Sequence, residues 1–496
     1  MLTGILLLTT FLSYGLDPPV KLWEKWYYTN HDGCHFRDME MTDDGNLFIT
    51  GSAWDWTQPI LEYYCAFLLD LDGNIIWEVE QPWYVGKGND GIVLPDSTFV
   101  ITGRCVEAPD STYSLFLMKI SQEGSVEWTR IYDYPETREE GYGITCLPDG
   151  GFAVCGRVHG TSISYGQAWI MRTDAYGDTL WTREWGNTAP NSSDYGKAIL
   201  YNNNEICVLA GGRSDSLPTN SSHLLFYDLD GNYLRGTDYG DILYYLFPAD
   251  MCLATDGGYT FTTKTFPPLW HTDQYGETLW WKSIYVTPGD QHEAFCLRQT
   301  FDSGYIFSGW DGYSEWDEDI GCLPDEEGLL QRSSPGQDAV DYGEGWLVRF
   351  DSEGNELWNI NNTVSADNHY YSCLQLPQGG YMVCGTWEGS SGFLVRYAPE
   401  TGISSPDPAS SLTLEVSPNP FVSVLSVSFS LPEEDQAALT VYDLYGRTVG
   451  EMVSGSYPGG TSTIEWTPPP DLGSGCYFVR LNTSEESVTR SCVLIR

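Results

Sequence analysis

A two-part unit recurs along most of the sequence, and this repetition restricts the possible folds more than any other feature. The first part is a turn, often Asp-Gly or Gly-Gly, followed by an apolar run, and it occurs seven times. Its turns lie at Asp44, Asp96, Asp149, Asn204, Asp256, Asp302 and Gln378. The second part is a Gly turn followed by a Trp-containing run, and it occurs six times. Its aligned residues are Trp77, Trp128, Trp181, Arg235, Trp280 and Trp358.

Each unit is long enough for four short strands joined by tight turns. A Trp-centred segment ahead of the first unit, Lys21 to Trp26, has the character of the missing second part. The sequence therefore predicts an all-β fold, a seven-bladed β-propeller over residues 20–398 that is closed by the N-terminal strand. The recurrent Trp is expected to pack between adjacent blades, because its large ring buries much apolar area. An open solenoid of stacked sheets is the alternative.

The repeat also carries a family resemblance. The motif from Asp174 to Trp181 resembles the docking repeat of PQQ-like propellers, with one residue fewer between Asp and Gly. It is similar to the Asp-box of sialidases as well, with both spacings one residue longer. The whole unit looks most like the repeats of propellers in secreted bacterial proteins. This resemblance covers most of residues 20–400 and implies a fold rather than a reaction.

Composition and charge exclude several classes of function. Asp and Glu outnumber Lys and Arg by 69 to 24, which gives a net charge of −45. This charge argues against binding of nucleic acid and against docking on an anionic membrane surface. Residues 1–15 contain a short apolar run followed by Ser13-Tyr14-Gly15, and they are predicted to be a secretory signal peptide. No other run is long and apolar enough to predict a transmembrane span.

The C-terminal part has a different character. Residues 399–411 are rich in Pro and Ser and are predicted to be a linker, and residues 412–496 contain short alternating segments that predict a small β-sandwich. The segments Ser417–Phe421, Val441–Arg447, Gly475–Arg480 and Val493–Arg496 resemble the C-terminal sorting domain of type IX secretion cargo, an immunoglobulin-like domain related to that of the flagellar hook-capping protein. The resemblance implies export through the periplasm, recognition by the type IX translocon, and release or attachment at the outer cell surface.

Thirteen cysteines leave at least one thiol unpaired within the chain. Those that recur on predicted strands are expected to be buried as small apolar side chains. Three pairs flank predicted hairpins and could form cross-strand disulfides. These pairs are Cys146 with Cys155, Cys373 with Cys384, and Cys476 with Cys492.

Three histidines are candidate metal ligands. His35 and His369 each lie nine residues before the turn of their unit, and His292 lies ten before Asp302. Their units are neighbours in a closed ring, so the side chains could converge at one mouth of the channel and bind zinc, manganese or a similar divalent metal. Seven-bladed oligogalacturonate lyases bind a metal through clustered histidines, and the arrangement is similar in type. However, a one-residue offset turns His292 to the opposite face of a regular strand, so unrelated placement of the three is the alternative.

A second candidate site is a group of indoles that follow the second strand of units one, six and seven. These residues are Trp54, Trp56, Trp310, Trp316 and Trp387. Exposed indoles are suitable platforms for sugar rings. Packing of the same indoles between blades is the alternative interpretation.

Two functional hypotheses follow. The first is an exported, non-enzymatic propeller at the cell surface or outside the cell that binds an extracellular partner, a glycan or a protein, and needs no cofactor. The second is a metal-dependent, lyase-like enzyme that degrades an acidic polysaccharide at the three-histidine site. Elimination would also need a base, and the sequence identifies none.

Overall fold

The computed structural model describes the chain from residue 18 to residue 494 with gaps. The described residues are 18–29, 31–55, 61–81, 85–106, 112–134, 137–160, 166–186, 194–213, 220–240, 246–264, 268–283, 290–313, 323–324, 330–331, 342–362, 368–387, 391–400, 413–417, 421, 423–431, 435–443, 448–469, 472, 475–483 and 487–494. Every regular element among them is a β-strand. The chain divides into two compact units, residues 1–400 and 401–496.

The first unit contains seven four-stranded antiparallel sheets, and in six of them the strands follow chain order from the inside outward. Sheets 1 and 2 contain β2 (Gly33–Met41), β3 (Leu47–Asp55), β4 (Leu61–Leu69) and β5 (Ile75–Gln81), then β6 (Val85–Val93), β7 (Phe99–Val106), β8 (Ser114–Ile120) and β9 (Val126–Tyr132). Sheets 3 and 4 contain β10 (Thr137–Cys146), β11 (Phe152–Gly160), β12 (Gly166–Thr173) and β13 (Thr179–Trp185), then β14 (Tyr195–Asn202), β15 (Glu205–Arg213), β16 (Asn220–Asp228) and β17 (Tyr233–Asp238).

Sheets 5 and 6 contain β18 (Pro248–Leu253), β19 (Tyr259–Thr263), β20 (Pro268–Thr272) and β21 (Thr278–Ser283), then β22 (Asp290–Gln299), β23 (Tyr305–Tyr313), β26 (Tyr342–Phe350) and β27 (Glu356–Asn362). Between β23 and β26, the short strands β24 (Leu323–Pro324) and β25 (Leu330–Gln331) pair with each other. Sheet 7 contains β28 (Asn368–Gln375), β29 (Tyr381–Trp387), β30 (Ser391–Tyr397) and β1 (Lys21–Tyr27). The predicted all-β fold of repeated four-stranded sheets is confirmed.

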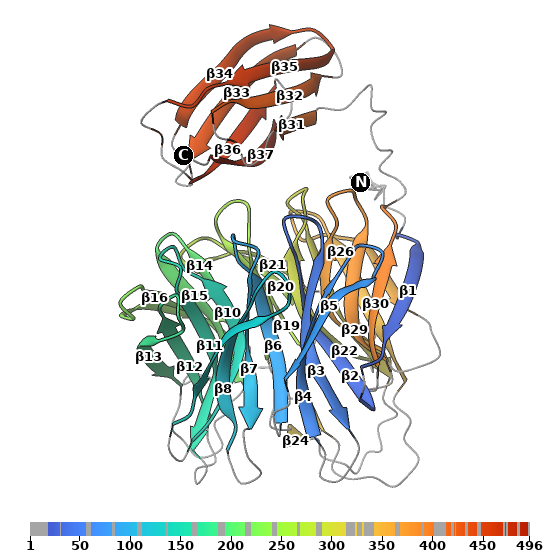
Figure 1. The fold of residues 1–496 in the computed structure, drawn as a ribbon, viewed down its shortest axis with the longest axis vertical. Helices are drawn as coiled ribbons and strands as arrows, with labels where there is room; N and C mark the ends of the chain where they lie inside the picture. Colours follow the sequence, from blue (N-terminus) through green and yellow to red (C-terminus); the bar gives the residue numbers. More distant parts are fainter. Residues whose placement is uncertain are drawn as a thin grey trace, which may run out of the picture. The chain divides into compact units, whose positions relative to one another are not determined.

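The outer strand of sheet 7 comes from the start of the described chain. β1 pairs antiparallel with β30, and Trp26 lies opposite Phe393 in this ladder. Figure 1 shows β1, in blue, beside β30, in orange. The first strand of each sheet lies beside the first strand of the next, and β28 of sheet 7 lies beside β2 of sheet 1.

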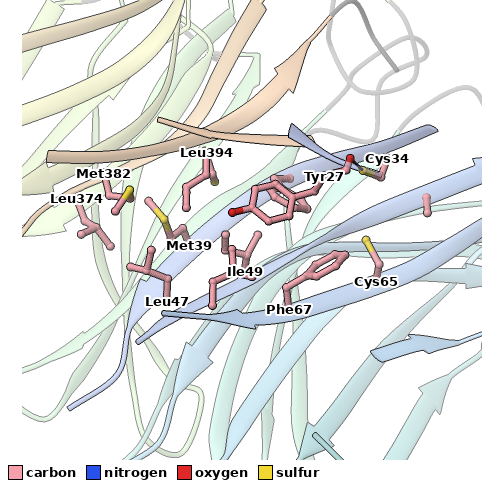
Figure 2. Close-up of a cluster of buried hydrophobic side chains, with 14 of the residues drawn as sticks. Tyr27, Cys34, Met39, Leu47, Ile49, Cys65, Phe67, Leu374, Met382 and Leu394 are labelled. Atoms are coloured by element: carbon pink, nitrogen blue, oxygen red, sulfur yellow. Dashed lines mark hydrogen bonds between the residues drawn. The ribbon is translucent and has the colours of Figure 1, made fainter. Parts of the chain in front are cut away.

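The core of the first unit consists of seven clusters of buried side chains, and each cluster lies between two successive sheets. Successive residues of one strand serve opposite interfaces: Ile49 packs toward sheet 7, whereas Phe48 packs toward sheet 2. Both faces of these sheets are therefore apolar, which explains the continuous apolar runs in the sequence. Figure 2 shows the cluster between sheets 7 and 1, where Tyr27 of β1 lies among side chains of both sheets.

The recurrent Trp packs against the Gly turn of the following sheet, as the sequence predicts. A side chain at Gly124 would collide with Trp77, and one at Gly231 would collide with Trp181. Both indoles also donate their Nε1 hydrogen to a backbone carbonyl of the following turn, at 2.9 Å. Trp23 of β1 stands in the same relation to Gly73 of sheet 1, so β1 repeats the packing of the other outer strands.

The proposed cross-strand disulfides do not form among the described residues. Cys146, Cys155, Cys373 and Cys384 all carry free thiols. The reason is register: Cys384 lies opposite Ser372 rather than Cys373, and Cys492 lies opposite Tyr477 rather than Cys476. A one-residue offset places the two side chains of each pair on opposite faces of the sheet.

The second unit is a two-sheet sandwich. One sheet contains β31 (Thr413–Ser417), β32 (Leu425–Leu431) and β35 (Gly460–Trp466), and the other contains β34 (Thr448–Tyr457), β33 (Asp435–Asp443), β36 (Gly475–Asn482) and β37 (Ser487–Leu494). Alternate residues of β32 are buried, which matches the period of two expected for a sheet with one buried face. Their side chains share one core with those of β33 and β36.

Candidate functional site

The first strand of every sheet in the first unit is irregular at the same place. In each, the register shifts across one residue that has no partner on the second strand, as in a β-bulge. The seven bulged residues are Arg37, Asn89, Tyr142, Lys197, Ala249, Phe295 and Tyr371. A bulge re-aims its side chain, so the same position in seven strands can face one common space.

All seven bulged residues line one solvent-open cavity, here called the chamber. Three further residues complete its wall: Lys87, Tyr195 and Lys264. The lining thus holds four cationic side chains, three tyrosines and one phenylalanine, and no carboxylate belongs to it. The protein as a whole has a net charge of −45, so the chamber is a local region of positive electrostatic potential that attracts anions.

The cations of the chamber lie close to its aromatic rings. The guanidinium carbon of Arg37 lies 5.6 Å from the centre of the Tyr371 ring, and Nζ of Lys197 lies 5.8 Å from that of Tyr142. Nε of Arg37 is buried and donates no hydrogen bond to any described residue. The Lys87 side chain is buried, with Nζ 4.0 Å from Oε1 of Glu140. A chamber of this kind can hold an anionic group and a flat ring together.

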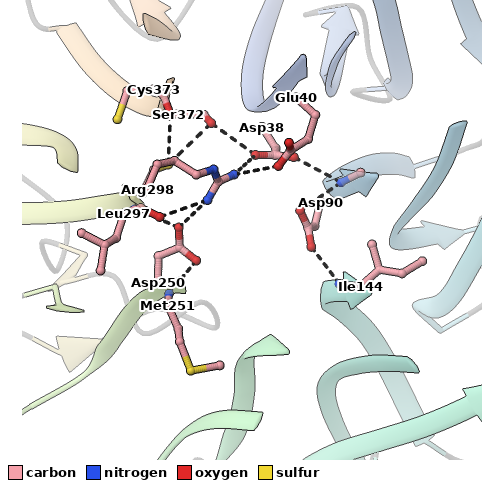
Figure 3. A network of polar contacts seen from close by, with 12 residues as sticks. Asp38, Glu40, Asp90, Ile144, Asp250, Met251, Leu297, Arg298, Ser372 and Cys373 are labelled. Carbon is pink, nitrogen blue, oxygen red and sulfur yellow. Dashed lines mark hydrogen bonds and ion pairs between the residues drawn. The ribbon is translucent and has the colours of Figure 1, made fainter. Parts of the chain in front are cut away.

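An ion-pair network is formed by residues that follow the bulges in the first strands of the sheets (Figure 3). Arg298 of β22 contacts Asp250 of β18 at 2.9 Å and Asp38 of β2 at 3.1 Å. It also reaches Glu40 at 3.2 Å. Desolvation raises the pKa of the Glu40 carboxyl to about 7, and Arg298 opposes the rise.

Three aspartates of this network connect neighbouring sheets. Asp38, Asp90 and Asp250 each follow the bulged residue of their strand. Their carboxylates accept backbone N–H groups from the next sheet: Gly91 at 3.3 Å, Ile144 at 2.7 Å and Leu297 at 2.8 Å, respectively. Burial, with Asp38 nearby, raises the pKa of Asp90 well above its usual range. We assign this layer a structural role, because its polar groups satisfy one another.

The structure sets His292 apart from His35 and His369. His35 and His369 occupy equivalent positions, opposite Ser52 and Thr386, and both rings lie near Tyr371, at 6.4 and 5.7 Å between centroids. Glu293 occupies this position in sheet 6. His292 instead packs against Trp346 and contacts Asp311 at 2.9 Å. Among the described residues, no group of three or more His, Cys, Asp or Glu side chains is arranged to hold a metal ion.

Two of the five indoles are buried. Trp54 and Trp310 are each 8% exposed, and they pack on His35 and His369 at 4.3 and 5.6 Å between centroids. Neither therefore presents an open face to a sugar ring. Trp387 is half-buried and meets Trp26 of β1 edge-on at 6.4 Å. Trp56 and Trp316 lie outside the described residues.

Sequence reasoning missed the residues of the chamber, although a signal for them exists. Each bulged residue lies seven positions before the turn of its unit, and the connecting aspartates lie six before. Counting nine positions back instead selects the row of His35 and His369. The seven-residue count gives Arg, Asn, Tyr, Lys, Ala, Phe and Tyr, which have no common chemistry until the bulge aims them at one space.

Residues 415–495, which span the sandwich, match the family described as Secretion system C-terminal sorting domain. The chain carries a sorting domain. A domain of this kind marks its chain for export by the type IX secretion system. The protein is therefore secreted to the cell surface or the extracellular space. Among the described residues there is no helix with the length and apolarity that crossing a bilayer requires.

Comparison of the whole chain with known proteins gives distant likenesses. Virginiamycin B lyase from Staphylococcus aureus is 14% identical, with a TM-score of 0.44, and the match covers 75% of this chain and 99% of that chain. A putative gluconolactonase is 10% identical, with a TM-score of 0.32, over 64% of this chain and 90% of that chain. No curated protein matches the sequence. These likenesses assign no activity.

Proposed function

We propose that the protein is a secreted, non-enzymatic propeller that binds an extracellular glycan carrying a carboxylate, with the acidic sugar seated in the chamber. The observation that carries this proposal is the meeting of four cations and four aromatic rings in one cavity of a strongly acidic protein. A uronate presents a carboxylate at its edge and an apolar patch on its face. Arg37 and Lys197 supply charge, and Tyr371 and Tyr142 supply flat surfaces beside them.

Calorimetric titration tests the proposal, with galacturonate as ligand and neutral galactose as its comparison. Galacturonate is expected to bind and galactose to bind at least about tenfold more weakly, because one charge-assisted contact contributes about 1.5–3 kcal/mol. Arg37→Gln and Lys197→Gln should each weaken galacturonate binding by a similar factor. Lys282→Gln, on the outer strand β21, removes a cation remote from the chamber and should have no effect. Equal binding of both sugars would contradict the proposal.

For export, we propose that the type IX translocon recognises the sorting domain after passage through the periplasm. The sorting domain is then removed, and the propeller is released or attached to the surface. Deletion of residues 413–496 should leave the propeller inside the cell envelope, as fractionation and immunoblotting can measure. Secretion of the truncated chain at the normal level would contradict this role.

A further inference from the structure

A second, smaller pocket, open to solvent, adjoins the chamber at Tyr142. Its lining comes from sheets 2 and 3: Arg104, Tyr113, Arg138, Glu139, Glu140, Tyr142, Arg157 and His159. We call it the arginine pocket, because three arginines and a histidine contribute to it. Tyr142 lines both cavities, so the two adjoin at this side chain.

The arginine pocket repeats the chemistry of the chamber. The guanidinium carbons of Arg104 and Arg138 lie 4.6 and 6.0 Å from the ring centre of Tyr113. One of its two carboxylates, Glu140, is already engaged by Arg104 at 3.2 Å and by the amide of Asn89 at 2.8 Å. The other, Glu139, is buried, and burial raises its pKa to about 7. Cations therefore dominate the pocket, and an aromatic ring lies among them.

One strand positions both cavities. β10 carries Arg138 near its start and Tyr142 at its bulge. Arg157 lies opposite Glu140 on β11, and His159 lies opposite Arg138. Lys87 and Asn89, which line the chamber, both contact Glu140. Cationic side chains of both cavities thus meet at Glu140, Lys87 from the chamber and Arg104 from the arginine pocket.

We infer that the arginine pocket is a second subsite and that the ligand is a chain of uronate residues spanning both cavities. This inference rests on the proposed function, because it places the first uronate in the chamber. The next uronate passes Tyr142 and puts its carboxylate among Arg104, Arg138 and Arg157, with its ring against Tyr113. A polyuronate has one carboxylate and one ring in every unit, which matches a path where cations and aromatic rings alternate. An acidic peptide has the charges without the rings.

Chain length provides the test. Calorimetric titration of the full mature protein compares galacturonate, tetragalacturonate and a tetraglutamate peptide. Wild-type protein should bind tetragalacturonate at least about tenfold more tightly than galacturonate, through the added charge-assisted contacts. Arg138→Gln and Arg157→Gln should each remove most of this gain. Arg37→Gln should weaken both sugars, and Lys282→Gln should weaken neither.

The possible outcomes are distinguishable. Failure of both sugars to bind would overturn the proposed function together with this inference. Galacturonate binding without a gain for tetragalacturonate would overturn the second subsite and leave the chamber proposal standing. A gain that survives both arginine substitutions would place the subsite elsewhere and overturn the assignment. Equal affinity for tetraglutamate would overturn the polyuronate assignment. Thermal unfolding of each variant confirms that the compared proteins are folded.

Discussion

At the scale of single residues, Gly124 shows how the repeats hold together. It adopts φ of 83° in its turn, and a methyl group there would lie 2.8 Å from Cγ of Trp77 on the preceding sheet. Gly45 has the same φ of 83° with nothing within 4 Å of the corresponding position. The two glycines therefore separate the effect of backbone conformation from the effect of packing between sheets.

The pair gives a prediction for stability. Gly45→Ala should reduce the free energy of unfolding by about 1 kcal/mol, the effect of a left-handed conformation alone. Gly124→Ala should reduce it by about 2–4 kcal/mol, because the indole must also move. Denaturant unfolding followed by Trp fluorescence measures both changes. Equal effects of the two substitutions would show that Trp77 does not restrain the turn.

Glu139 gives a prediction for pH dependence. Burial raises its pKa from 4.5 to about 7 in the folded protein. At pH values between these two, the folded state keeps a proton on Glu139 that the unfolded state has lost. Its contribution to stability is therefore present at low pH and is lost as the pH rises through about 7. Glu139→Gln should remove this pH dependence. Between pH 5 and pH 8, the free energy of unfolding of the variant should rise relative to that of the wild type by at most about 3 kcal/mol. Parallel pH profiles of the two proteins would contradict the assignment.

At the scale of the strand, the bulge determines which side chains face the chamber. It interrupts the alternation of side chains in every first strand, so the residue before it, the bulged residue and the residue after it have distinct surroundings. The bulged residues line the chamber, and in three of the seven strands the aspartate after the bulge accepts a backbone N–H of the next sheet. The proposed binding site and these contacts between sheets thus come from adjacent positions of the same strands.

Arg298 tests the linking layer. Arg298→Met leaves Asp38, Glu40 and Asp250 without their cation, and removal of one partner from a buried ion pair typically destabilises by about 3–5 kcal/mol. The loss should be larger at pH 8 than at pH 5, because burial raises the pKa of Glu40 to about 7 and at pH 5 this carboxyl is mostly neutral and needs no cation. Denaturant unfolding at both values measures it, with Arg130→Met on the outer strand β9 as control. A loss independent of pH would indicate that packing, and not charge, is what Arg298 contributes.

At the scale of the whole molecule, β1 is the element on which the last sheet depends. It supplies Trp23 and Tyr27 to the contacts between sheets 7 and 1. Deletion of residues 18–27 should reduce the free energy of unfolding by about 4 kcal/mol, from the loss of the buried Tyr27 ring and the partly buried Trp23 ring. Addition of a peptide of sequence KLWEKWY should restore part of it, whereas Tyr28→Ser, a change at an exposed neighbour, should have no effect. Differential scanning calorimetry measures all three.

The fold could be predicted from the sequence because turn residues and Trp residues recur at the same places in successive units. Asp-Gly turns and Trp77-type residues mark the sheets and their packing, and the Trp-centred segment before the first unit predicted the partner of β30. The site was harder to predict. A bulge brings Arg37 to the chamber, whereas ordinary alternation along β22 turns His292 to the face opposite that of Glu293. Exposure of Trp54 and Trp310 depends on side chains of other strands, which periodicity does not reveal.

The pairing of β1 with β30 also determines when folding can finish. A chain synthesised or exported from its N-terminus presents β1 first, but the partner strand appears only after all the intervening repeats. Until then, the apolar edges of sheets 1 and 7 stay exposed, and such late, long-range pairing is slow. A chain that ends before β30 therefore leaves β1 without its partner strand. The packing between sheets 7 and 1 cannot form in such a chain.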